Sequence, residues 1–136
     1  MDKKTYVTEN FCREEFCVTS TGFFNVPSKT EWDNLYYGIK KLLQPLRERI
    51  GVPIIITSGY RSKKVNEAVG GSPTSQHMTG NAVDFKTHDP KDLEKCVRIL
   101  SQSPLVDQLL AGGGWIHLSW STTYRPRRII KPHFYG

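Results

Sequence analysis

The sequence has few of the features that mark a disulfide-bonded or membrane protein. It contains only three cysteines, Cys12, Cys17 and Cys96, an odd number without a convincing metal-binding spacing, so reduced and partly buried thiols are expected. No run of eighteen apolar residues occurs, which excludes a membrane-spanning helix. The first eight residues lack the apolar segment of a signal peptide, so we expect synthesis in the cytoplasm without export by that route.

The residues that are present suffice for one folded domain. The 136 residues are 38% hydrophobic and include three Trp, six Tyr and six Phe, so a sizeable core can be buried. We predict a single domain over 1–136, with its core at about 8–120 and an extended basic tail at 121–136. No heptad pattern or apolar edge indicates self-association, so a monomer is expected.

The net charge of +6 raises the question of a polyanionic partner. Most of the 19 Lys and Arg residues are interleaved with acidic residues, and only a few cluster near the C-terminus. These clustered residues are Arg125, Arg127, Arg128 and Lys131. Such a basic surface aids solubility and encounter with any polyanion, including bacterial wall polymers, and we expect no nucleic-acid partner.

One long helix is predicted over 29–50. Ser28 and Glu31 have the spacing of a capping box, and apolar residues follow at helical intervals. Pro45 is expected to kink this helix or to separate its last turn, because proline lacks the backbone N–H that the helix needs. Gly51 supplies the C-terminal stop.

Three shorter helical segments are predicted at 8–18, 63–69 and 89–103. Asp89 would cap the third, with Pro90 at its first position. Each segment has apolar residues that would face the core: Phe11 and Phe16 in the first, Val65, Ala68 and Val69 in the second, and Leu93, Cys96, Val97 and Leu100 in the third.

Four β-branched or alternating runs predict strands, at 53–58, 81–86, 105–110 and 115–120. The first should be buried, and the last two should form a hairpin around the glycine-rich turn 111–114. The fold class is therefore α+β, with a small, mainly antiparallel sheet and helices packed on one face. Side chains alternate along a strand, so Asp84 should lie on the opposite face of its strand from Val83 and Phe85. In the last strand, Trp115, His117 and Ser119 should share one face.

Three side chains on these strands and loops could bind a metal ion. His77 lies in a loop, Asp84 follows in the next strand, and His117 lies in the last strand. An aspartate inside an apolar strand is costly unless a charge or several donors compensate it, and a metal ion would do so. Two histidines and a carboxylate are a common ligand set for catalytic zinc, which keeps a fourth position for water or substrate. The alternative is three ordinary buried polar residues.

Arg61 follows directly after the first predicted strand. An arginine at that place can reach into a site, where its planar guanidinium suits a bidentate grip on a carboxylate. The alternative is an ordinary surface arginine. His88 and His133 lie outside the pattern and are expected to have no part in the site.

Three blocks of sequence occur in order: Ser58-Gly59-Tyr60-Arg61, then Ser75-x-His77-x-x-Gly80-x-Ala82-x-Asp84, then Trp115-Ile116-His117. Together they resemble the zinc D-alanyl-D-alanine carboxypeptidase family over about residues 8–120. That family includes the D-Ala-D-Ala dipeptidases of vancomycin resistance and the peptidoglycan peptidases of bacteriophage endolysins, and the Hedgehog signalling domain shares its metal-site fold. The chain is most similar to the short, phage-type members.

The resemblance implies one zinc ion bound by His77, Asp84 and His117. It also implies that Arg61 binds the substrate peptide and its developing charge, and that Ser75 and Trp115 line the substrate cleft. The substrate would be a peptidoglycan stem peptide, so the protein would act at the bacterial cell wall and could be phage-encoded. Zinc in such a site polarises the scissile carbonyl and lowers the pKa of its bound water.

The chain departs from the family at the general base. Active members usually carry Glu or Asp a few residues before the last histidine, commonly three before it, where this chain has Gly114; Gly112 and Gly113 are also non-acidic. The base could come from elsewhere, for example from Asp107, although an aspartate there looks structural in the family pattern. Alternatively, zinc-bound hydroxide alone gives slow turnover, or the domain binds wall peptides without cutting them.

The sequence therefore predicts a zinc metallopeptidase, a hydrolase of the carboxypeptidase or endopeptidase type that acts on peptidoglycan. The alternative is a weak or inactive zinc-containing module that binds cell-wall peptides.

Overall fold

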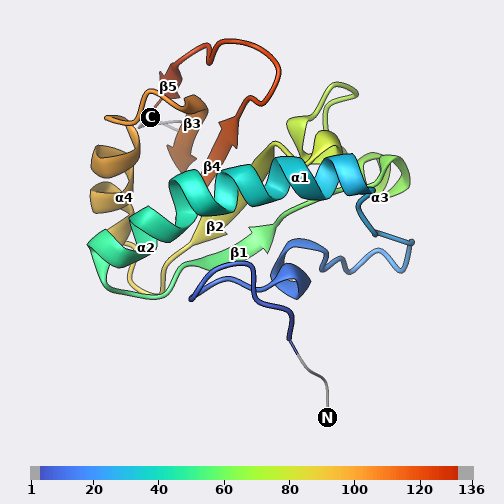
Figure 1. Ribbon diagram of the computed structural model, residues 1–136, viewed down its shortest axis with the longest axis horizontal. Coiled ribbons are helices and arrows are strands. Elements are labelled where there is room, and N and C mark those ends of the chain that lie inside the picture. Colours follow the sequence, from blue (N-terminus) through green and yellow to red (C-terminus); the bar gives the residue numbers. More distant parts are fainter. Residues whose placement is uncertain (1–3, 132–136) are drawn as a thin grey trace.

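The computed structural model describes residues 4–131, and it has the α+β fold that the sequence predicts (Figure 1). Its elements in chain order are η1 (Arg13–Phe16), α1 (Lys29–Gly38), η2 (Ile39–Leu43), α2 (Gln44–Ile50), β1 (Ile55–Ser58), α3 (Lys63–Ala68), η3 (Gln76–Thr79), β2 (Ala82–Lys86), α4 (Asp92–Leu100), β3 (Val106–Gly112), β4 (Trp115–Trp120) and β5 (Ile129–Lys131).

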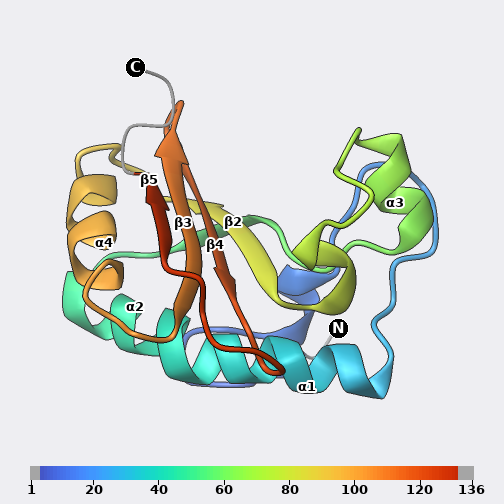
Figure 2. The ribbon, with the colours of Figure 1, turned by 90° about the horizontal axis from the view of Figure 1, so that it is seen from above.

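The five strands form one sheet in the order β1-β2-β4-β3-β5. Every neighbouring pair is antiparallel except β3 and β5, which run parallel. Helices α1 and α2 form one long arm across the strands, with α4 beside α2 and α3 near the other end of the arm (Figures 1 and 2). The sheet is therefore mainly antiparallel, as predicted.

The hydrophobic core lies between the helices and one face of the sheet. Alternate residues of β2 and β4 point into it, and all of them are fully buried: Val83, Phe85, Ile116, Leu118 and Trp120. The helical arm contributes Leu35, Ile39, Leu43 and Leu46, also buried. Each such side chain stabilises the fold by roughly 1.5–3 kcal/mol. Because side chains alternate along a strand, the residues between them on β2 and β4 face the other way.

The long helix predicted over 29–50 is present, and Pro45 does not split it. Instead η2, just before Pro45, is a π-helical turn that joins α1 to α2. A proline in a helix lacks a donor and its ring crowds the carbonyl four residues earlier, and one wider turn relieves both problems. The predicted capping box is formed, since Ser28 Oγ accepts from Glu31 N at 3.3 Å. Gly51 ends the arm with a positive φ of 70°.

The predicted helix over 8–18 is wrong, because only the 3₁₀ turn η1 forms there. The segment instead folds on itself, with a bridge between Tyr6 and Cys12. A helix this short is marginal unless tertiary contacts support it. Phe11 and Phe16 are nevertheless buried in the core, as predicted.

Helix α3 is present, but two of its three predicted inward residues are not buried. Val65 faces the interior, whereas Ala68 is exposed and Val69 is 52% exposed just past the helix end. The helix has six residues and therefore too few turns for a continuous apolar face. Asn66, which is 1% exposed, fills the remaining inward position.

Strands β2, β3 and β4 lie where the sequence predicts them, within two residues. The prediction of a buried first strand is wrong, because β1 lies at the sheet edge and is only half-buried. Helix α4 starts at Asp92, three residues after the predicted cap, although Asp89 Oδ1 accepts from Lys91 N at 3.0 Å and so caps the turn before it.

The basic tail contributes the strand β5, which the sequence analysis did not predict. Two of its arginines bond within the molecule: Arg127 pairs with Asp107, and Arg128 donates to the carbonyl oxygens of Ser101 and Ser103. His133 lies outside the described residues. Within the described part of the chain, all three cysteines are free thiols, and no helix is both long enough and apolar enough to cross a membrane.

Candidate metal centre

Two of the predicted ligands lie directly opposite each other on neighbouring strands. Asp84 of β2 pairs in register with His117 of β4, and paired residues of an antiparallel ladder project from the same face. This face is the one turned away from the core. The third residue, His77, comes from η3, the 3₁₀ turn that leads into β2. The fold thus brings together three residues that are far apart in the sequence.

Their polar atoms converge closely enough to share one ion. Asp84 Oδ1 lies 2.8 Å from His117 Nδ1 and 3.3 Å from His77 Nε2, and one ligand atom from each of the three residues lies within 4.8 Å of the other two. Ligand atoms around a tetrahedral zinc ion, with bonds of about 2.0–2.1 Å, are roughly 3.3 Å apart. The donor set and its spacing therefore fit zinc.

The orientation of His77 is set by its surroundings. Its Nδ1 lies 2.7 Å from the carbonyl oxygen of Gly59, and since a carbonyl only accepts, Nδ1 carries the proton. The Nε2 lone pair is then free to face Asp84 and His117. A ligating histidine fixed through its other nitrogen is the usual arrangement at metal sites.

The backbone of the His77 turn is fixed at both ends. Ser75 Oγ caps it by accepting from His77 N at 3.2 Å. Gly80 closes it with a positive φ of 80°, and a Cβ there would collide with the backbone oxygen of Glu31 in α1. The serine and glycine of the sequence motif thus both have a structural reason.

Asp84 is held in its ionised form. Burial alone would raise the pKa of this carboxyl, but its contacts with the His117 and His77 imidazoles outweigh that effect and keep the pKa well below its usual range. Arg61 Nη2 approaches the second oxygen, Oδ2, at 3.4 Å. One oxygen of Asp84 therefore faces the histidines while the other faces a cation.

Arg61 reaches into the site, as expected from its place after β1. Its side chain is only 17% exposed, so it is not an ordinary surface arginine. Nε donates to Ser58 Oγ at 3.1 Å and Nη1 to Asn66 Oδ1 at 3.3 Å. These two contacts fix the guanidinium plane beside Asp84.

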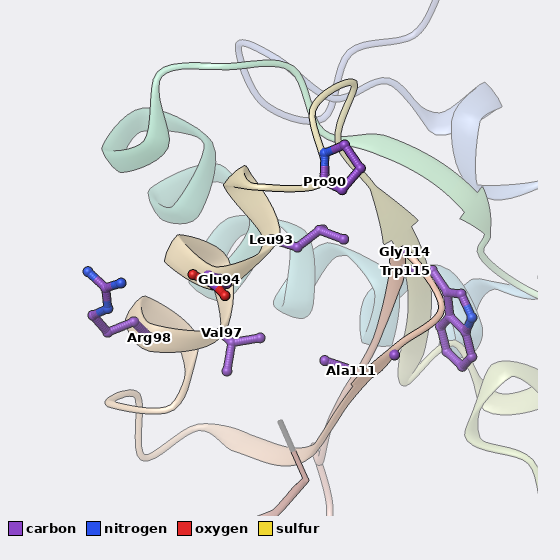
Figure 3. A pocket seen from close by; sticks show the side chains of 9 residues that line it. Pro90, Leu93, Glu94, Val97, Arg98, Ala111, Gly114 and Trp115 are labelled. Atoms are coloured by element: carbon purple, nitrogen blue, oxygen red, sulfur yellow. The ribbon is translucent and has the colours of Figure 1, made fainter. Parts of the chain in front are cut away.

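Trp115 and Ser75, the other predicted substrate contacts, line two different cavities. Trp115 begins β4 and shares the face of His117, and Figure 3 shows it projecting from the hairpin away from helix α4. It borders a mainly apolar cavity of about 450 Å³ between α4 and the hairpin. None of the three converging residues lines that cavity.

Gly112, Gly113 and Gly114 stand at or beside the position where the family usually carries its general base, and they form the end of the hairpin. Gly112 pairs with Trp115 as the last residue of β3, so a side chain there would share the face of Trp115 and His117. Gly113 and Gly114 form the two-residue turn, with positive φ values of 60° and 84°. Such values are typical of a type I′ turn, which favours glycine at both positions.

Asp107, the acid that the sequence offered as another base, is engaged elsewhere. It is fully buried, and Arg127 donates to it through its backbone N at 2.7 Å and through its Nη2 at 2.6 Å. Burial alone would raise its pKa, but the bonds from Arg127 lower it to about 2. A carboxylate with so little affinity for protons is a poor general base.

The sequence analysis missed the groups that hold the site residues. The carbonyl of Gly59 and the side chains of Ser58 and Asn66 contact His77 or Arg61. A backbone carbonyl leaves no signal in a sequence. The Ser58-Gly59 pair in the first of the three sequence blocks was the one indication.

A His–Asp–His cluster beside a mostly buried arginine is a donor set that could hold a catalytic metal ion. The family model Peptidase M15 matches residues 6–119, and the chain belongs to that family. This match confirms the resemblance to the zinc D-Ala-D-Ala carboxypeptidases. The comparison with curated proteins found no matching sequence.

Proposed function

We propose that this protein is a zinc-dependent peptidase that hydrolyses the stem peptides of bacterial peptidoglycan. The observation that carries the proposal is the convergence of His77 Nε2, Asp84 Oδ1 and His117 Nδ1 in a member of the peptidase M15 family. Zinc bound by these residues would supply a Lewis acid and an activated water near neutral pH.

The chain's own residues would bind and orient the substrate. Arg61 uses three of its nitrogens within the protein, yet a guanidinium has five N–H donors, so it retains donors for a peptide carbonyl or carboxylate. Trp115, on the same face as His117, would pack against the peptide. Ser75 would act mainly by holding the turn that carries His77.

Proton transfer is the weak part of this proposed enzyme. Among the described residues 4–131, the converging group has one carboxylate, that of Asp84, and this carboxylate is itself a proposed metal ligand. Losing a positioned acid–base group typically lowers the rate by about 10²- to 10⁴-fold. Slow turnover is therefore the expected behaviour.

The Gly112–Gly114 turn also favours a second candidate function. A domain that keeps its metal ligands but lacks a proton-transfer group could bind wall peptides through zinc without hydrolysing them. In either case the protein would act at the cell wall, as a monomer, in a setting such as phage lysis.

The two functions differ in their products. Zinc-loaded protein is incubated with peptidoglycan stem peptides, and released amino acids or dipeptides are measured by mass spectrometry. The enzyme proposal expects release that a chelator abolishes and added zinc restores, with Asp84→Ala as the inactive control. Zinc-dependent peptide affinity without any product would support the binding module and overturn the peptidase. The size of the product would distinguish carboxypeptidase from endopeptidase action.

A further inference from the structure

A second cavity, of about 420 Å³, lies between η3, α1 and the segment that follows β4. Its volume is within the roughly 300–1,000 Å³ typical of small-ligand pockets. Ten of its eleven lining residues are uncharged Ser, Thr, Asn, Gln or Tyr, and the eleventh is Arg127. Such a lining indicates a ligand that is bound through neutral hydrogen bonds. We call this cavity the polar groove.

The buried carboxylate of Asp107 holds one wall of the polar groove in place. It accepts from Gln76 Nε2 at 3.0 Å, from the Tyr124 hydroxyl at 3.1 Å and from Arg127 Nη2 at 2.6 Å. Asp107 is 0% exposed, and its negative charge offsets that of Arg127. Three lining side chains are thus fixed together and the wall carries no net charge.

A second wall is ordered by further hydrogen bonds. Thr122 Oγ1 donates to Asn34 Oδ1 at 2.8 Å and accepts from Asn81 Nδ2 at 3.4 Å. Thr79 Oγ1 donates to Asn81 Oδ1 at 2.7 Å. Side chains that are already ordered lose little conformational entropy when a ligand binds, so both walls are pre-organised for binding.

These properties select a sugar over a peptide. Sugar hydroxyls both donate and accept, which matches a lining of hydroxyls and amides, whereas charged peptide termini need an unpaired opposite charge. Tyr124 is 48% exposed and offers a ring on which the apolar face of a pyranose can pack. We propose that the polar groove binds the glycan part of peptidoglycan, as N-acetylated hexosamine units.

The groove's position gives this binding a use. Ser75 and Gln76 line it, and the next residue along the chain is the proposed ligand His77. A glycan held there would bring its attached stem peptide next to the metal centre. This inference rests on the proposed function for its biological meaning, but the sugar binding itself requires no metal.

The test uses the trimer of N-acetylglucosamine as the probe and the full-length protein without zinc. Titration followed by NMR should give saturable shifts at groove residues such as Thr122 and Tyr124. Tyr124→Ala should weaken binding about tenfold or more, and Thr122→Val, which removes one hydroxyl at nearly constant shape, should weaken it less. Phe24→Ala removes an 83%-exposed aromatic outside the groove and should leave binding unchanged.

Thermal unfolding of each variant shows whether it is folded before its affinity is compared. Absence of saturable trimer binding, or shifts confined to residues outside the groove, would overturn the inference. So would unchanged affinity in a folded Tyr124→Ala variant. Trimer binding without any peptide release would support the inference while removing the proposed peptidase. Equal hydrolysis of free and glycan-linked peptides, without trimer binding, would do the reverse.

Discussion

The middle of strand β4 and its hairpin end are built very differently on the face that carries His117. Around the middle of the strand, each of the three converging residues has a partner: His77 has the Gly59 carbonyl, His117 has Asp84, and Asp84 has Arg61. At the hairpin end, 112–114 offers only glycine. The difference shows that the groups that would bind a metal and the groups that would move a proton are separable in this chain.

The largest effect is expected from removing Asp84, the residue that contacts both histidines. Asp84→Ala should lower zinc affinity by at least about a hundredfold, because losing a group that merely hydrogen-bonds to a metal ligand already costs about 10- to 100-fold. It also leaves Arg61 without its anionic partner. Isothermal titration with zinc, with metal content by mass spectrometry, measures the effect.

Asp33→Ala is the matched control, since its ion pair with Lys29 is exposed on α1. Surface pairs of this kind contribute only about 0–1 kcal/mol. Equal zinc affinity in Asp84→Ala and Asp33→Ala would contradict the account of the metal centre.

The second prediction concerns a new acidic side chain at the hairpin end, where the chain has only glycine. The register predicts that Gly112→Glu projects its carboxylate on the face of His117, and a positioned acid–base group raises rates by about 10²- to 10⁴-fold. Peptide release by the two enzymes, compared at equal zinc occupancy, measures the gain.

Gly114→Glu is the matched comparison, because the same side chain is added two residues later. Position 114 has a φ of 84°, so glutamate there is strained by roughly 1–2 kcal/mol and lies in the turn rather than on the strand. A larger gain at 114 than at 112 would show that the strand register misplaces the base. A parent enzyme that is already fully active would show that a base lies elsewhere.

The third prediction concerns the buried pair of Asp107 and Arg127. Asp107→Asn should lower the free energy of unfolding by about 1–3 kcal/mol at neutral pH, because buried donors lose their charged acceptor. The folded-state pKa of Asp107 is lowered to about 2 from 3.8. Its stabilisation is therefore complete above about pH 4 and is lost as the pH falls toward 2.

Urea unfolding at several pH values measures both effects. The parent should lose more stability between about pH 4 and 2 than Asp107→Asn does, although Asp84 contributes in the same direction in both proteins. Parallel pH profiles for the two proteins would contradict the assignment of this stabilisation to Asp107.

The smallest predicted effect is the loss of the cap before His77. Ser75→Ala should lower the free energy of unfolding by about 0.5–2 kcal/mol, the usual range for a capping side chain. Zinc affinity should fall only slightly, because Gly59 still orients the imidazole. A large loss of affinity with unchanged stability would give Ser75 a direct role at the centre instead.

Much of the fold could be predicted from local pattern. The arm over 29–50 has a capping box and a regular apolar spacing, and the β3–β4 hairpin has a glycine turn between apolar strands, so both signals are local and strong. Where the outcome depended on tertiary contacts, prediction failed. The segment 8–18 buries its two phenylalanines without forming a helix, and the three-residue strand β5 is too short to show a period.

The candidate site could be predicted only in part, for a similar reason. His77, Asp84 and His117 are side chains at fixed spacing, which a sequence displays directly. The Gly59 carbonyl that orients His77 is a backbone atom, and the Asp107–Arg127 pair joins β3 to a residue twenty positions later, just before the unpredicted strand β5. The polar groove likewise combines η3, α1 and the tail, which only the folded chain brings together.

The central claim is that one zinc ion is bound jointly by the turn imidazole, the strand carboxylate and the hairpin imidazole. A crystal structure of the zinc-loaded protein, with anomalous diffraction at the zinc edge, tests it most directly. The account predicts one strong peak within bonding distance of His77 Nε2, an oxygen of Asp84 and His117 Nδ1. A peak bound by other residues, or no peak from fully loaded protein, would contradict it.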